Sequence, residues 1–319
     1  MFLSSILCLL WPAHSSAAGA VDHGSALHDL QQGRADSALT RLQPFAVQND
    51  AQASQLLCRV ALQLEQWDQA VTECERAVSL DADNSDNHMW FGRALGEKAD
   101  RTSFIKAYGL GKRVKTEFET AVSLDPHNAD ALADLGEFYK DAPAIVGGGK
   151  DKADAIASRL DGVDRARAEY LRATIAASNH DNNAAIRHFH EAIKASSQPA
   201  LYWMALASYY QKQNDLPHMQ EAIHAGLSAR GAQGEPLVDA AHLLIKSGQD
   251  PQMAIHLLRQ YLDSPFKSED EPAFRVHRLL ATLLDKQGDA AGAARENQAA
   301  AALASGYHPN KDTATNTGR

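Results

Sequence analysis

The chain has 319 residues, of which 45% are hydrophobic and 22% charged, an ordinary balance for a globular protein. Its net charge is −9, and no stripe or long run of basic residues occurs along it. This balance argues against nucleic acid as a partner, because lysine and arginine would have to neutralise the phosphates.

The N-terminus begins with the apolar run MFLSSILCLLW, which is too short to span a bilayer. Small residues follow, with Ala18 and Ala20 in an A-x-A arrangement. We therefore predict a cleaved signal peptide at 1–20 and a periplasmic or secreted protein. No lysine or arginine precedes the apolar run, so a short apolar N-terminal helix of a cytoplasmic protein stays open as the alternative. No other segment is long and apolar enough to predict a membrane span.

Blocks of about 34 residues then recur along the chain. The fragment AVSLDADN at 77–84 returns as AVSLDPHN at 121–128, and one block carries Trp203, Leu206, Ala207 and Tyr210 at helical spacing. This pattern resembles the tetratricopeptide repeat, and in particular exported bacterial tetratricopeptide proteins of unassigned activity. The resemblance implies an all-α, right-handed superhelical solenoid of about eight helix hairpins over 21–305. It also implies a protein or peptide partner, no catalysis and no cofactor. The polar end at 306–319 is predicted to be disordered.

The predicted hairpins follow one another in chain order, and small or polar residues mark the turns between their two helices. The second hairpin covers 55–84 and turns near Glu65 and Gln66. The clearest turn residues in the other hairpins are Gly33, Asn214, Gly248 and Gly288.

Two segments interrupt the period. About ten extra residues lie in the third unit, between Arg93 and Phe118. The fourth unit contains Pro143 and three successive glycines at 147–149, which should end one helix and lengthen the turn to the next. Long connections often carry function in a solenoid.

Two cysteines lie in the second hairpin, at nearly equal distances from its turn. Antiparallel helices would place Cys58 opposite Cys74, and an exported protein permits a disulfide there. The alternative is two small buried apolar side chains.

A peptide groove is expected on the first helices of the hairpins, as the resemblance implies. Arg59 and Arg93 occupy the same position in successive units and would hold a carboxylate or acidic side chain of a peptide. Alternatively, Arg93 pairs with Glu137 of the next unit as a surface ion pair. The projected groove residues are Gln55, Arg59, Met89, Arg93, Glu137, Lys140, Met204, Ser208 and Lys212.

Catalytic and metal motifs are missing from the sequence. Gly147–Lys150 is followed by Asp151 where a phosphate-binding loop needs Ser or Thr, and no Cys/His spacing predicts a zinc site. The main interpretation is therefore a non-catalytic scaffold that binds a protein or peptide in the cell envelope. The alternatives are a structural subunit bound through its edges, a binder of small ligands and an enzyme.

Overall fold

The computed structural model describes residues 23–308, so the signal peptide predicted at 1–20 lies outside the described residues. Within 23–308, sixteen α-helices form eight antiparallel hairpins, and no strand occurs. The first helices of the hairpins are α1 (His23–Gln31), α3 (Ala51–Gln63), α5 (Ser85–Ala99), α7 (Ala129–Asp141), α9 (Arg165–Ser178), α11 (Pro199–Lys212), α13 (Glu235–Ser247) and α15 (Ala273–Lys286). The second helices are α2 (Ala35–Leu42), α4 (Trp67–Leu80), α6 (Phe104–Leu124), α8 (Lys150–Leu160), α10 (Asn182–Ala195), α12 (Leu216–Leu227), α14 (Pro251–Asp263) and α16 (Ala290–Leu303). The predicted all-α solenoid of eight hairpins is confirmed.

Most hairpins turn on a residue with left-handed backbone geometry, as the sequence predicts. Gly33, Gly248 and Gly288 have φ of 65°, 67° and 83°, and Asn214 has φ of 57°. Glycine adopts this geometry without a steric penalty, and asparagine tolerates it. Many of the helices begin at an Asp or Asn whose side chain accepts a backbone N–H of the first turn, as Asp50 does from Ala53.

The two interruptions become ordered structure in the third and fourth hairpins. The extra residues of the third unit lengthen α6 to 21 residues, whereas the other second helices have between 8 and 14. The second interruption forms the 3₁₀ helix η2 (Ala144–Val146) and a turn through the glycines before α8. Another 3₁₀ helix of the same length, η1 (Gln43–Phe45), follows α2.

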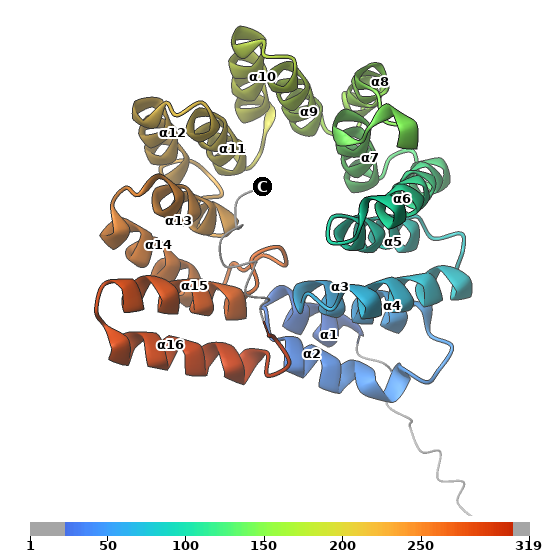
Figure 1. Cartoon of the computed structure of the whole chain (residues 1–319), viewed down its shortest axis with the longest axis horizontal. Coiled ribbons are helices and arrows are strands. Elements are labelled where there is room, and N and C mark those ends of the chain that lie inside the picture. The colour runs from blue at the N-terminus through green and yellow to red at the C-terminus, as the bar shows by residue number, and fades with distance from the viewer. Residues whose placement is uncertain (1–22, 309–319) are drawn as a thin grey trace, which may run out of the picture.

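The eight hairpins bend into a closed ring (Figure 1). The first helices form its inner layer and the second helices its outer layer, and the last hairpin lies beside the first. Phe274, fully buried on α15, and Ala300 on α16 belong to the same core cluster as Leu30 and Leu56 near the N-terminal end. The two ends of the array therefore bury each other's apolar surface. An open solenoid would instead need terminal repeats with a polar outer face.

Polar contacts complete this seam between the ends. The backbone N–H of Ser305 donates to Asp36, and Arg275 donates to the backbone oxygen of Gln63 at 2.9 Å. Gly33 lies directly against the start of α15, since a Cβ added to it would lie 2.2 Å from the backbone nitrogen of Ala273. Because the ends meet, the concave face encloses the interior of the ring (Figure 1).

The last described residues pack against this seam as well. Tyr307 is only 6% exposed and its ring centroid lies 4.9 Å from that of Phe274. The packed chain thus continues past the boundary that the sequence placed at residue 305, while 309–319 lie outside the described part of the chain.

Cys58 and Cys74 form a disulfide between α3 and α4, with Cα atoms 5.2 Å apart. This lies within the range that disulfide geometry requires. The bond ties together the two helices of the second hairpin, next to the seam. No helix between residues 23 and 308 has both the length and the apolar character needed to cross a membrane.

Candidate functional site

The inner face of the ring contains two adjoining hollows. The first hollow, of about 980 Å³, lies between α3, α5, α6, α7 and the loop before α15, and its lining includes Trp90, Arg93, Phe104, Asp134, Glu137 and Ile145. The second hollow, of about 880 Å³, lies along α7, α9, α11 and α13, and its lining includes Glu137, Tyr170, Tyr202, Met204, Asp239 and Asp270. Both volumes fall within the range of ligand sites.

The projected groove residues divide between these hollows and other places. Arg59 and Arg93 line the first hollow, Met204 and Ser208 the second, and Glu137 both. The other four line neither hollow. Met89 is 3% exposed in the core, and Gln55 donates a hydrogen bond to Asn87.

The remaining two projected residues are lysines. Lys140 pairs with its neighbour Asp141, and Lys212 is exposed at the end of α11. Neither belongs to the lining of a hollow.

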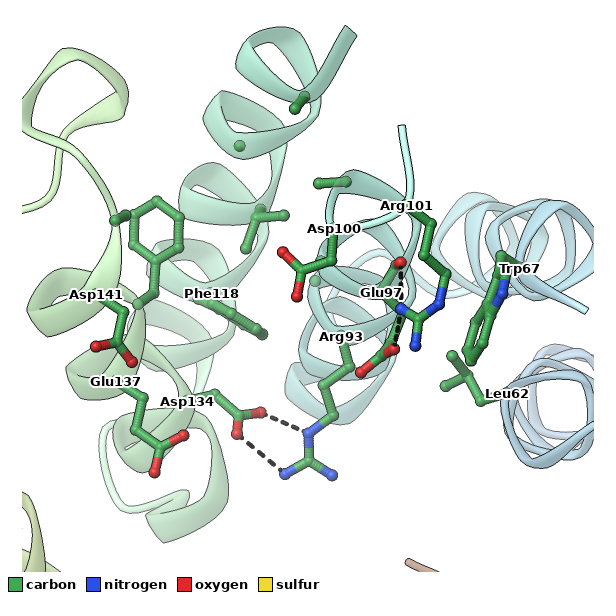
Figure 2. Close-up of a pocket in the computed structure, with 18 of the residues that line it drawn as sticks. Leu62, Trp67, Arg93, Glu97, Asp100, Arg101, Phe118, Asp134, Glu137 and Asp141 are labelled. Carbon is green, nitrogen blue, oxygen red and sulfur yellow. Dashed lines mark hydrogen bonds and ion pairs between the residues drawn. The ribbon is translucent and has the colours of Figure 1, made fainter. Parts of the chain in front are cut away.

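Arg59 and Arg93 lie over the same indole ring and are each held by a carboxylate. Their guanidinium carbons are 4.7 and 4.5 Å from the centroid of Trp90. Arg59 donates two hydrogen bonds to Glu269, of 2.9 and 2.5 Å, across the seam. Arg93 donates two to Asp134, of 2.6 and 3.2 Å (Figure 2). The partner of Arg93 is therefore Asp134 and not Glu137, which lies one turn further along α7.

The second hollow instead gathers several carboxylates on α13 and the loop before α15. Glu235 and Asp239 lie one turn apart on α13, and the seam loop adds Asp270 and Glu271. Asp239 makes no hydrogen bond or ion pair with any residue of 23–308 that would neutralise it. Burial, then the charge of Glu235, raises the pKa of Asp239 well above its usual value.

The pKa values of two neighbouring carboxyl groups, Glu235 and Asp270, are raised as well. Burial and the charge of Asp270 raise the pKa of Glu235 from 4.5 to about 7, although Ser268 donates a hydrogen bond of 2.9 Å to its carboxylate. Burial also raises the pKa of Asp270. His242 reaches Glu271 at a distance of 3.8 Å. The lining of the second hollow contains six Asp or Glu residues against four Arg or Lys residues, so its charge is negative on balance.

The sequence matches no protein-family model and no curated protein. Among solved structures it is similar to a thermophilic TPR protein of Thermus thermophilus, with 18% identity over 58% of this chain and 98% of that one and a TM-score of 0.49. A tetratricopeptide repeat protein of Parabacteroides merdae has 12% identity over 82% of this chain and 95% of that one, with a TM-score of 0.48. MamA has 17% identity over 53% of this chain and 93% of that one, with a TM-score of 0.42.

Antiparallel helix pairs of this length, repeated at this period and stacked in register, identify the fold of the chain. It is of the tetratricopeptide type. In this tetratricopeptide array the first helix of each pair lies on the inner side of the ring (Figure 1).

Sequence reasoning missed the acidic residues that give the interior its character. Glu235 and Asp239 have the i, i+4 spacing that puts two side chains on one helix face, which was a readable signal. Glu269, Asp270 and Glu271 occur in the run SEDEP, which has the composition of a solvent-exposed loop. Only closure of the tetratricopeptide array turns that loop toward the interior.

Proposed function

We propose that this protein is a non-catalytic binding protein that holds a positively charged segment of a partner protein or peptide inside its ring. The observation that carries the proposal is Asp239, a carboxylate in the wall of the second hollow with no compensating partner between residues 23 and 308. A lysine or arginine side chain of a partner would supply the missing charge.

The energetic argument follows from the cost of burying charge. A carboxylate removed from water without a partner is unfavourable, and a cation placed beside it recovers part of that cost. Three carboxylates without an ion pair among residues 23–308, Glu235, Asp239 and Asp270, face one hollow, so one cationic segment can neutralise several of them. Arg59 and Arg93 are already engaged by Glu269 and Asp134, and this argues against capture of an acidic peptide at these arginines.

A peptide array with matched charge reversal tests the proposal. Lysine- and arginine-bearing peptides should bind, their glutamate counterparts should not, and raising the salt from about 50 to about 500 mM should weaken binding. The double substitution Asp239→Asn and Asp270→Asn should raise Kd at least about tenfold. Asp154→Asn, on the exposed outer face of α8, is the control and should leave Kd unchanged. Equal binding by the double variant would refute the proposal.

A small organic cation is a second candidate for the same hollow. Tyr170 and Tyr202 line it with ring centroids 6.0 Å apart, and aromatic faces attract cations. Titration of an aliphatic diamine by calorimetry distinguishes the two candidates. Tight binding of the diamine with no binding of the peptides would favour the small ligand.

We further propose that the protein is exported to the cell envelope. The predicted signal peptide and the Cys58–Cys74 disulfide support this location, because disulfides persist in oxidising compartments. Cell fractionation followed by N-terminal sequencing tests it. A cytoplasmic chain that keeps Met1 and free thiols would contradict it.

A further inference from the structure

The two interruptions of the repeat, which lie in consecutive units, meet at one place on the ring. The 3₁₀ helix η2 packs on the extended part of α6, since a Cβ added to Gly111 would lie 3.4 Å from Val146. Lys115 of α6 lies against Gly147 just after η2. The inserted segments therefore support each other, and they form the rim of the first hollow together.

This rim exposes large apolar side chains. Phe104 is 80% exposed and Ile145 65% exposed, and both line the first hollow. Ile105 beside them is 85% exposed. None of residues 104–113 is fully buried, so the first turns of α6 project beyond the core of the array. Isolated exposed apolar residues are ordinary, but a group of them at the edge of a hollow marks an interaction site.

The wall below this rim is acidic. Eight Asp or Glu residues and four arginines line the first hollow, and no lysine does. Asp100 lies on one side of Phe118 in the lining of the hollow, and Asp141 and Glu137 lie on the other side (Figure 2). Asp141 is paired with Lys140, whereas Glu137 forms no ion pair with any residue in the described part, and burial raises its pKa.

We infer that the first hollow is a docking site for a cationic amphipathic segment of a partner protein, with apolar side chains on one face and lysine or arginine beside them. Its apolar face would pack on Phe104 and Ile145, and its basic side chains would reach Glu137 and the neighbouring carboxylates. Binding of an amphipathic segment in a groove follows the ordinary rules of peptide recognition. The inference goes beyond the proposed function, since it names a second site with its own anchors.

The chain itself does not supply this occupant. Residues 1–22 contain no lysine or arginine, and residues 309–319 contain no large apolar residue. A second copy of the chain carries a net charge of −9, which opposes docking on an acidic hollow. Charge complementarity therefore favours a different protein.

The test uses the full mature chain and two probe peptides, an amphipathic helix of leucine and lysine and its leucine–glutamate counterpart, both fluorescently labelled. The leucine–lysine peptide should bind and its counterpart should not. The double substitution Phe104→Ser and Ile145→Ser should raise Kd at least about tenfold without changing the melting temperature, since both side chains are largely exposed. Val47→Ser is the matched control, because Val47 is 88% exposed and lines neither hollow.

Further variants separate this site from the interior one. Asp239 lines only the second hollow, so Asp239→Asn should leave binding of the leucine–lysine peptide unchanged, while Glu137→Gln should weaken it because Glu137 lines both hollows. Phe104 and Ile145 line only the first hollow, so their variants report on that site alone. Unchanged Kd in the Phe104/Ile145 variant, or equal binding of the two peptides, would overturn the inference. It would also be overturned if the same variant abolished only self-association in sedimentation velocity, or only binding to vesicles of anionic phospholipid.

Discussion

Substitution of Gly33 tests whether the ring is closed in solution. Gly33→Ala places a Cβ 2.2 Å from the backbone nitrogen of Ala273 and 2.9 Å from the carbonyl carbon of Pro272. Backbone atoms cannot rotate away as side chains do, so the seam must separate. Gly248→Ala is the matched control, because Gly248 has φ of 67° against 65° for Gly33 and a Cβ there would meet nothing within 4 Å.

The expected free-energy changes follow from this comparison. Both substitutions place alanine in left-handed geometry, which costs roughly 1–2 kcal/mol. Gly33→Ala carries in addition an overpacking cost of about 1–3 kcal/mol at the seam. Its melting temperature should therefore lie roughly 2–8 °C below that of Gly248→Ala.

Small-angle scattering and thermal unfolding give the two readouts. Gly33→Ala should increase the radius of gyration, because the first and last hairpins part, whereas Gly248→Ala should leave it unchanged. The same radius of gyration and the same melting temperature in both variants would show that the seam is not closed in solution, and the reasoning would be refuted.

Three further predictions concern charge and covalent structure. The pKa of Glu235 rises from 4.5 to about 7 on folding, so its contribution to stability is complete below pH 4.5 and is lost as the pH rises through 7. At pH 8, Glu235→Gln should therefore be more stable than the unaltered protein by up to about 3 kcal/mol. Denaturant unfolding of the variant with an unchanged pH dependence would contradict this prediction. Replacing Cys58 and Cys74 by serine should cost about 3 kcal/mol, seen as a lower melting temperature that reductant no longer affects, and equal melting temperatures would count against it. Arg93→Ala should destabilise the fold by about 2–4 kcal/mol, because the buried Asp134 loses its partner. The double variant Arg93→Ala with Asp134→Ala should be more stable than Arg93→Ala alone, and a double variant that is no more stable would contradict this explanation.

The sequence was sufficient to predict the hairpins, because each depends on interactions between near neighbours in the chain. Gly33, Asn214, Gly248 and Gly288 mark turns through a backbone geometry that few residues adopt readily. The position of Arg59 and Arg93 on the inner face followed from the resemblance to the tetratricopeptide repeat. Their shared contact with Trp90 depended on rotamers that a period does not specify.

Closure of the ring could not be predicted in this way. It depends on the sum of small rotations between eight hairpins, and an error at each step accumulates. Glu269 and Asp270 lie more than 200 positions from Arg59, and nothing in their local sequence indicates that they meet. The acidic interior was therefore missed although every carboxylate in it was visible.

A closed ring also restricts how such a chain can change over evolutionary time. An open array can gain or lose a unit at either end. Here each of the eight units supplies about an eighth of a full circle. One unit more or one fewer would leave Phe274 without its neighbours near the N-terminus. Added length is then tolerated only where it leaves the circumference unaltered. The lengthened α6 and the η2 turn are additions of this kind, since they pack on each other at the rim of the first hollow and add no unit to the circumference.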